Sequence, residues 1–120
     1  MSKVLMNPVE WSEFLGKVAM RDIDAFWYAT FDLRPDLGFE ARKQLFFDGL
    51  EMAVRGGQVK LQAAGAVLKT PPSEEFRKLY DAWPEESQFD EDLFWITKSD
   101  NGWTTFGLVW IADDGAEIWM

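Results

Sequence analysis

The sequence predicts an α+β fold in which N-terminal helices and one mid-chain helix pack on a mainly antiparallel sheet with a C-terminal β-meander. Apolar residues recur at helical spacing before residue 56 and again before Pro84. After residue 92 the pattern changes to strand-like runs separated by Asn-Gly and Asp-Gly turns. The length of 120 residues suits a single domain, residues 1–120, with its own core.

The first helix is predicted to begin at Asn7. Asn7 caps the helix, Pro8 occupies the first helical position, and Glu10 can bond back to the cap. Four apolar side chains then share one face of this helix: Trp11, Phe14, Leu15 and Val18.

The segment from Asp22 to Thr30 fits either a short helix or a buried strand. Ile23, Phe26 and Trp27 have helical spacing, whereas three consecutive aromatic residues also fit a strand. We favour the helix because two aspartates at its start suit the positive end of the helix dipole. A loop over residues 32–35 would follow.

The longest predicted helix starts at Asp36, which is expected to be its N-cap, and ends at Gly56-Gly57. Residues 59–63 then alternate between apolar and polar, which is typical of a half-buried strand. One stripe of the helix steps by three and four residues: Phe39, Lys43, Phe46, Leu50 and Ala53. Phe47 and Val54 widen the same face.

A turn at Ala64-Gly65 leads to a short return strand at Val67-Leu68. The connector over residues 70–73 is stiff, and Ser73 is expected to cap the next helix, which Pro84 ends. The apolar face of that helix consists of four residues: Phe76, Leu79, Tyr80 and Trp83.

Three strands are predicted after the acidic block at residues 85–92, namely 93–98, 103–112 and 116–120. Turns at residues 100–102 and 113–115 separate them. The middle strand is apolar on both faces, which indicates that it lies inside the sheet or is covered on both sides.

Composition excludes several classes of site. The chain has no Cys and no His, so it lacks disulfides, thiolate or imidazole metal ligands, and Ser/His or Cys/His nucleophile pairs. We therefore expect no catalytic residues, no cofactor and no metal. The absence of a long apolar run or signal-like segment favours a cytoplasmic protein that spans no membrane.

The net charge of −9 is confined to one part of the chain. Residues 1–69 hold nine acidic and nine basic side chains, whereas residues 70–120 hold twelve acidic and three basic ones. Such a distribution attracts a basic partner and repels nucleic acid. Aromatic side chains ringed by acids are typical interface anchors. The predicted partner-binding residues are Glu85, Glu86, Asp90, Glu91, Asp92, Trp95, Asp113, Asp114 and Trp119.

Other interpretations stay open at this point. The acidic block lacks the spacing of a calcium-binding loop, and a solvated loop explains it equally well. A carboxylate-based enzyme is conceivable, but sequence cannot choose a pair among 21 acids. A homodimer or other structural oligomer could use the Trp-rich sheet face. A winged-helix DNA reader is disfavoured because residues 36–55 hold four acids and three bases.

Several segments of the sequence together carry a family resemblance: Phe26-Trp27-Tyr28, Phe39–Lys43 with Phe46-Phe47, Gly57–Leu61, Trp83-Pro84, Phe94-Trp95, Val109–Ile111, Asp114-Gly115 and Glu117–Trp119. These segments resemble a bacterial family catalogued as domain of unknown function 596. Trp83 and residues 101–105 depart from the family pattern. The resemblance implies a fold and a context rather than a catalytic site: such small acidic proteins occur beside polymorphic and contact-dependent toxin genes. It therefore implies an immunity protein that neutralises a cognate toxin.

Overall fold

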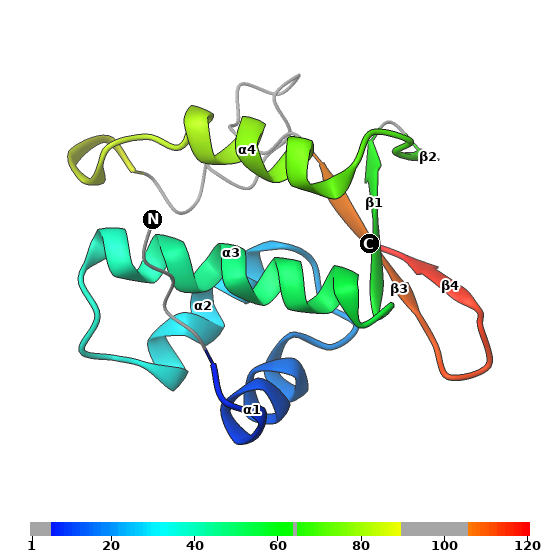
Figure 1. Cartoon of the computed structure of the whole chain (residues 1–120), viewed down its shortest axis with the longest axis horizontal. Coiled ribbons are helices and arrows are strands. Elements are labelled where there is room, and N and C mark those ends of the chain that lie inside the picture. Colours follow the sequence, from blue (N-terminus) through cyan, green and yellow to red (C-terminus); the bar gives the residue numbers. More distant parts are fainter. Residues whose placement is uncertain (1–5, 64, 90–105) are drawn as a thin grey trace.

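The computed structural model describes residues 6–63, 65–89 and 106–120, and they form the predicted α+β fold (Figure 1). Within these residues, three helices come first, followed by two strands, a fourth helix and two more strands. The elements are α1 (Pro8–Val18), α2 (Asp24–Leu33), α3 (Phe39–Arg55), β1 (Val59–Ala63), β2 (Ala66–Val67), α4 (Pro72–Ala82), a 3-10 turn (Glu86–Gln88), β3 (Gly107–Ile111) and β4 (Glu117–Trp119).

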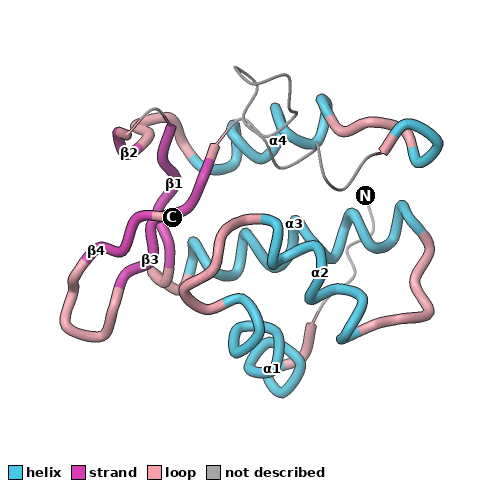
Figure 2. Tube along the Cα trace, turned by 180° about the vertical axis from the view of Figure 1, so that it is seen from behind, coloured by secondary structure: helices cyan, strands magenta, loops and turns pink. Residues whose placement is uncertain are grey.

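The sheet is antiparallel throughout and has the order β2-β1-β3-β4 (Figure 2). The prediction that the apolar strand lies inside the sheet is confirmed, because β3 pairs with β1 on one side and β4 on the other. The mid-chain hairpin and the C-terminal hairpin thus meet at the β1–β3 ladder. Among the described residues, β4 forms one edge of this sheet.

The three N-terminal helices form one packed group, and α4 lies on the opposite side of α3 from α1 (Figure 1). Trp27 of α2 is the centre of an aromatic cluster in this core. Its ring centroid lies 5.8 Å from that of Phe39, 5.6 Å from that of Trp83 and 5.0 Å from that of Phe89. The half-buried Phe89 therefore anchors the chain after α4 to the core, although the residues just before it are exposed.

The predicted capping of α1 is confirmed. The Asn7 side chain accepts from the Glu10 amide at 2.8 Å, and the Glu10 carboxylate accepts from the Asn7 amide at 3.2 Å. Phe14 and Val18 are buried on the predicted face, and the Phe14 ring rests against Gly49 of α3. The first helix is thereby fixed both at its start and along its buried face.

The helix interpretation of residues 22–30 is confirmed, since α2 covers Asp24–Leu33. The loop expected over residues 32–35 starts two residues later than predicted. Asp22 accepts a hydrogen bond from the Ile23 amide at 2.8 Å and so stabilises the entry to this helix.

The prediction that Asp36 caps the long helix is wrong. The N-cap of α3 is Gly38, which offers no side-chain hydrogen bond. The buried Arg42 explains the difference, because its guanidinium donates to the Leu37 carbonyl at 2.7 Å and draws the preceding turn onto the helix. The predicted stop at the glycine pair is confirmed, with Gly57 in the left-handed region at φ +74°.

The prediction that Ser73 caps the next helix is also wrong. Helix α4 begins at Pro72 with Pro71 as its N-cap, and no side chain caps it. Proline suits this first position because its missing N–H would have no helical acceptor there. The predicted stop before Pro84 is confirmed, with Trp83 as the C-cap.

Part of the predicted C-terminal region lies outside the described residues. This holds for the strand at 93–98, the turn at 100–102 and the first residues of the strand at 103–112. The turn at residues 113–115 is confirmed by Gly115 at φ +87° and by the hydrogen bond from the Ala112 amide to the Ala116 carbonyl. None of the described helices combines the length and apolar character that crossing a membrane requires.

Candidate functional site

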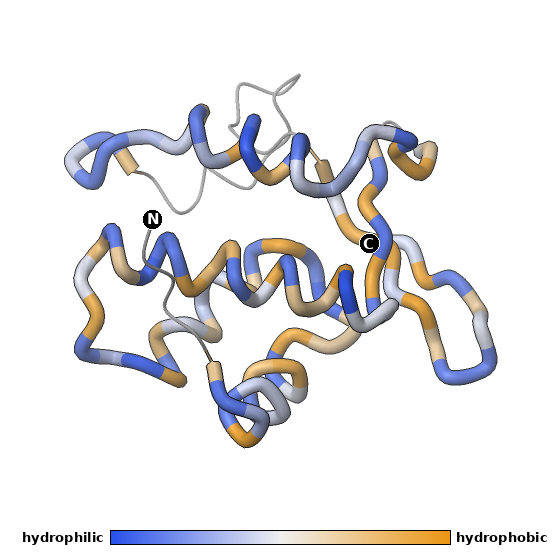
Figure 3. The backbone as a smooth tube through the Cα atoms, viewed as in Figure 1, coloured by the Kyte–Doolittle hydropathy of each residue, from blue (hydrophilic) through white to orange (hydrophobic). Residues whose placement is uncertain are grey.

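Glu85 and Glu86 lie in the turn that follows α4, and both are exposed. Figure 3 shows this turn as a largely hydrophilic stretch. The predicted partner-binding residues that come next in the chain lie outside the described residues: Asp90, Glu91, Asp92 and Trp95.

The remaining predicted residues lie together in the β3–β4 hairpin. Asp113 and Asp114 are exposed in its turn, and Trp119 is exposed in β4. Figure 1 places this hairpin and the turn after α4 at opposite ends of the molecule. The structure thus separates the described acidic candidates into two groups, and the hairpin alone combines acids with an exposed tryptophan.

The hairpin exposes three large apolar side chains in succession. Ile118, Trp119 and Met120 retain 40%, 43% and 39% of their full exposure. Consecutive strand residues point to opposite faces, so Trp119 lies on one face and Ile118 and Met120 lie on the other. Both faces of β4 therefore present apolar surface.

The two faces of β4 continue into different surroundings. On the face of Trp119, the residue across β3 is Val109, and the next residue across is Lys60. The Lys60 ammonium pairs with the Glu117 carboxylate at 3.0 Å. On the other face, Ile118 lies across from Trp110, which stacks on Phe26 in the helical core.

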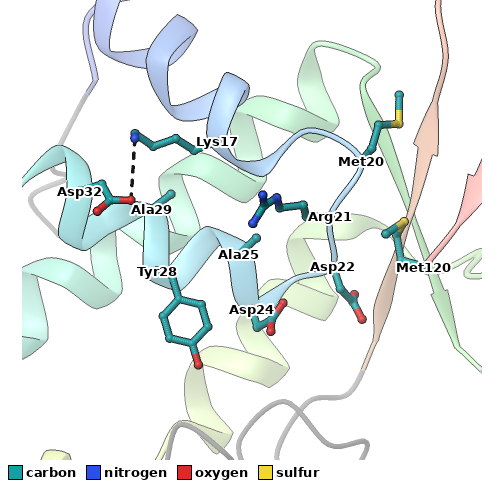
Figure 4. Close-up of a pocket in the computed structure, with 10 residues that line it drawn as sticks. All are labelled: Lys17, Met20, Arg21, Asp22, Asp24, Ala25, Tyr28, Ala29, Asp32 and Met120. Atoms are coloured by element: carbon teal, nitrogen blue, oxygen red, sulfur yellow. Dashed lines mark ion pairs between the residues drawn. The ribbon is translucent and has the colours of Figure 1, made fainter.

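A hollow of about 560 Å³ opens where the chain linking α1 to α2, helix α2 and Met120 meet (Figure 4). Three of its walls are apolar side chains with much of their surface exposed: Met20, Tyr28 and Met120. Met20 reaches this position through an unusual backbone, with φ at +61°. The Trp110 indole N–H fixes the same link by donating to the Arg21 carbonyl at 2.6 Å.

The charges around this hollow are mixed, with three carboxylates and two cations. Lys17 and Asp32 form an ion pair at 3.8 Å across one side (Figure 4). Burial raises the pKa of Asp24, and the neighbouring Asp22 carboxylate adds to the shift, while Arg21 opposes it. A carboxylate whose charge is destabilised in this way would gain from a further cation.

A second hollow, of about 620 Å³, lies between α3 and α4. Aromatic rings of Phe47, Phe76 and Tyr80 contribute to its walls. Its charged wall residues comprise three carboxylates (Asp48, Glu51, Asp81) and two guanidinium groups (Arg55, Arg77), so it presents no single sign of charge.

Two cations on α3 are buried: Lys43, which the sequence pattern placed on the apolar stripe, and Arg42, which it did not. The Arg42 guanidinium lies 3.8 Å from the centre of the Phe31 ring, and the Lys43 ammonium lies 3.7 Å from the centre of the Tyr80 ring. Burial lowers the pKa of Lys43, against the opposing effect of Glu40 and Asp81. Both cations connect α3 to neighbouring elements, and the sequence signal was their place on or beside the apolar stripe of α3.

Within residues 6–63, 65–89 and 106–120, no three His, Cys, Asp or Glu residues gather in a way that could hold a metal ion. The geometry that stands out chemically is instead the β3–β4 hairpin, where apolar side chains adjoin acidic ones at a sheet edge. Such a surface can bind another protein.

Comparisons with known proteins address the fold. A family model described as protein of unknown function DUF596 matches residues 54–120. The solved structure of an uncharacterized protein conserved in bacteria, from Neisseria meningitidis, is similar with a TM-score of 0.74 and 24% sequence identity. The similarity covers 92% of this chain and 87% of that one. No curated protein matches the chain significantly.

Proposed function

This chain belongs to the family of proteins of unknown function DUF596, and this membership assigns no activity to it. We propose that the chain is a non-enzymatic immunity protein. In this proposal it binds a cognate bacterial toxin of the polymorphic or contact-dependent kind and neutralises it by occupying its surface. The toxin domain is basic. The place of action is the cytoplasm, and no nucleic acid or membrane takes part.

The observation that carries this proposal is the composition of the exposed hairpin. Ile118, Trp119 and Met120 supply apolar area, and the exposed Asp113 and Asp114 lie in the turn of the same hairpin. Protein interfaces commonly combine a few aromatic anchors with a polar rim. Trp119 is the anchor in this arrangement, and the two aspartates belong to the rim.

The charge of the chain supports a basic partner. The net charge of −9 arises entirely from residues 70–120. A negative surface accelerates the diffusional encounter with a cation-rich protein, and the desolvated apolar contacts then slow dissociation. Toxins that cut nucleic acid are typically basic, so a nuclease is the natural candidate.

The experiment uses the product of the neighbouring open reading frame. Expressed alone in bacteria it should stop growth, and co-expression of this chain should restore growth. The two proteins should also co-purify in equal amounts at about 0.05–0.15 M salt, where the Debye length is roughly 8–14 Å. Absence of a complex over this range of salt would overturn the proposal.

A second candidate, a structural homodimer, also uses the exposed hairpin. An edge strand with apolar side chains can pair with a copy of itself. Sedimentation at high concentration distinguishes the two: an immunity protein is expected to stay monomeric without its toxin, whereas a stable dimer would favour the structural role.

A further inference from the structure

We propose that β4 binds an extended segment of the partner as an additional strand of the sheet, and that this segment carries Lys or Arg near both of its ends. This inference rests on the proposed function and deepens it by naming the mode of contact and the chemistry of the partner's segment.

The backbone of β4 has outward-facing hydrogen-bonding groups. The Met120 amide donates to the Leu108 carbonyl, and the Ala112 amide donates to the Ala116 carbonyl, so residues 116, 118 and 120 bond to β3. Antiparallel ladders alternate, and the N–H and C=O groups of Glu117 and Trp119 therefore point away from the sheet. In the described part of the chain, no strand pairs with β4 on that side.

Natural edge strands usually carry features that block further pairing, such as lysine, proline, a bulge or very short length. The other edge of the described sheet, β2, is only two residues long, and Lys69 and Pro71 follow closely. Strand β4 is also short, at three residues, but residues 117–120 of its edge contain no lysine or proline and expose three large apolar side chains. Within the described residues, this edge is thus open to strand addition, a common mode of peptide recognition.

The charges at the two ends of β4 select the partner. Asp113 and Asp114 lie at the turn end, and the hollow of Figure 4 joins Met120 at the other end to Asp22 and Asp24. Glu117, between the two ends, is already paired with Lys60. An added strand would therefore meet acidic groups at both of its ends and apolar groups at its centre.

The hollow also contains cations, but they leave an acidic excess. Lys17 is held in an ion pair with Asp32, and the charge of Arg21 partly offsets the raised pKa of Asp24. The raised pKa of Asp24, caused by burial and by Asp22, supports the view that a further cation would be stabilised here. Apolar walls from Met20, Tyr28 and Met120 suit the methylene stem of a long basic side chain.

The same charges disfavour a second copy of this chain as the occupant. If two β4 strands paired antiparallel about Ile118, the Asp113-Asp114 turn of one copy would lie beside the Met120 end of the other. The acids at the turn would then approach Asp22 and Asp24 of the second copy. Like charges brought together at both ends destabilise such a pair, whereas a basic strand avoids this cost.

The test uses a synthetic nine-residue peptide of alternating lysine and valine, with an alternating glutamate and valine peptide as the control. Amide hydrogen exchange of the full chain is followed by NMR. The lysine peptide should slow exchange at Glu117 and Trp119 saturably by about tenfold or more, and Ile118, already bonded to β3, should change less. No slowing at these two amides, or equal slowing by the glutamate peptide, would overturn the inference.

A matched pair of variants isolates the outward backbone groups. Glu117→Pro and Glu117→Ala both lose the ion pair with Lys60, but only the proline variant loses the outward N–H. Proline is tolerated where the N–H points away from the sheet. Glu117→Pro should weaken binding of the lysine peptide by about tenfold relative to Glu117→Ala. Equal binding by the two variants would overturn strand addition.

Two further measurements address two other outcomes: that Glu117→Pro does not fold, and that a second copy of this chain pairs with β4. If Glu117→Pro does not fold, the wild-type chain is tested with the lysine peptide N-methylated at every second residue, which should not bind. A wild-type dimer that Glu117→Pro dissociates would assign the edge to a second copy and overturn the inference. Failure with peptides leaves the growth-rescue result intact, so the two proposals fail separately.

Discussion

Gly49 shows how one missing side chain determines the contact between α1 and α3. A Cβ atom at this position would lie 2.6 and 2.8 Å from Cε1 and Cζ of the Phe14 ring. Phe14 is fully buried, so the ring cannot move aside. The glycine therefore permits an approach of the two helices that any larger residue would prevent.

Gly49→Ala is accordingly expected to lower the free energy of unfolding by about 1–3 kcal/mol. Gly16 is the matched control, because it lies in α1 with no heavy atom within 4 Å of the Cβ that an alanine would add. Gly16→Ala should raise stability by up to about 1 kcal/mol. Urea denaturation measures both, and a stabilising effect of Gly49→Ala would contradict the described packing.

The pair formed by Glu10 and Arg34 makes a second residue-scale prediction. The Arg34 Nε donates to Glu10 at 2.8 Å, and this hydrogen bond, with one from the Asn7 amide, lowers the pKa of Glu10. A carboxyl with a lowered pKa contributes stability above its ordinary value of about 4.5, and the contribution is lost as pH falls through the lowered value.

NMR titration of the Glu10 carboxyl tests this. Arg34→Met should raise the pKa of Glu10 toward its ordinary value, and the variant should lose less stability than the wild type as pH falls below about 4.5. Arg55→Met, which removes a different ion pair on α3, should leave the Glu10 titration unchanged. An unaltered Glu10 titration in Arg34→Met would refute the assigned cause.

At the scale of elements, the helix starts test which side chains act as caps. Asn7 caps α1 through its side chain, whereas Ser73 stands inside the first turn of α4. Asn7→Ala should cost about 0.5–2 kcal/mol, the usual loss for an N-cap. Ser73→Ala should change the free energy of unfolding by less than about 0.5 kcal/mol. Thermal or urea unfolding compares the two variants, and an equal loss of stability in both would indicate that Ser73 does cap α4.

The sequence predicted the boundary of an element correctly where that boundary depends only on a few adjacent residues. The Asn7 capping box, the glycine pair after α3 and the Asp-Gly turn before β4 each depend on a few adjacent residues, and all three are confirmed. The start of α3 was mispredicted because it depends on Arg42, whose guanidinium hydrogen-bonds a carbonyl five residues earlier. Sequence spacing does not reveal such a contact.

The candidate site was only partly predictable for a similar reason. Trp119, one of the residues that the sequence suggested for partner binding, is exposed in the structure. No sequence signal indicated that the turn after α4 and the β3–β4 turn lie at opposite ends of the molecule, because their separation depends on the packing of α4 against α3 (Figure 1). Nor could it show that Met120 meets the α1–α2 link, since that contact joins residues about 100 positions apart.

At the scale of the whole molecule, the two acidic ends are alternative sites for a basic partner. The turn after α4 offers Glu85 and Glu86, and the hairpin offers Asp113 and Asp114 with apolar neighbours. Charge alone does not distinguish the ends, because exposed carboxylates lie at both of them. The apolar side chains of β4 make the hairpin end the one that can hold a partner after the encounter.

The most direct test of this account is the rate at which the proposed toxin partner associates with two double variants. Asn and Gln keep the oxygen acceptors and remove only the charges. At about 0.05 M salt, Asp113→Asn with Asp114→Asn should slow association several-fold, whereas Glu85→Gln with Glu86→Gln should leave it within about twofold of the wild type. If the Glu85 and Glu86 variant is the slower one, or if neither variant differs from the wild type, the hairpin is not where the partner binds.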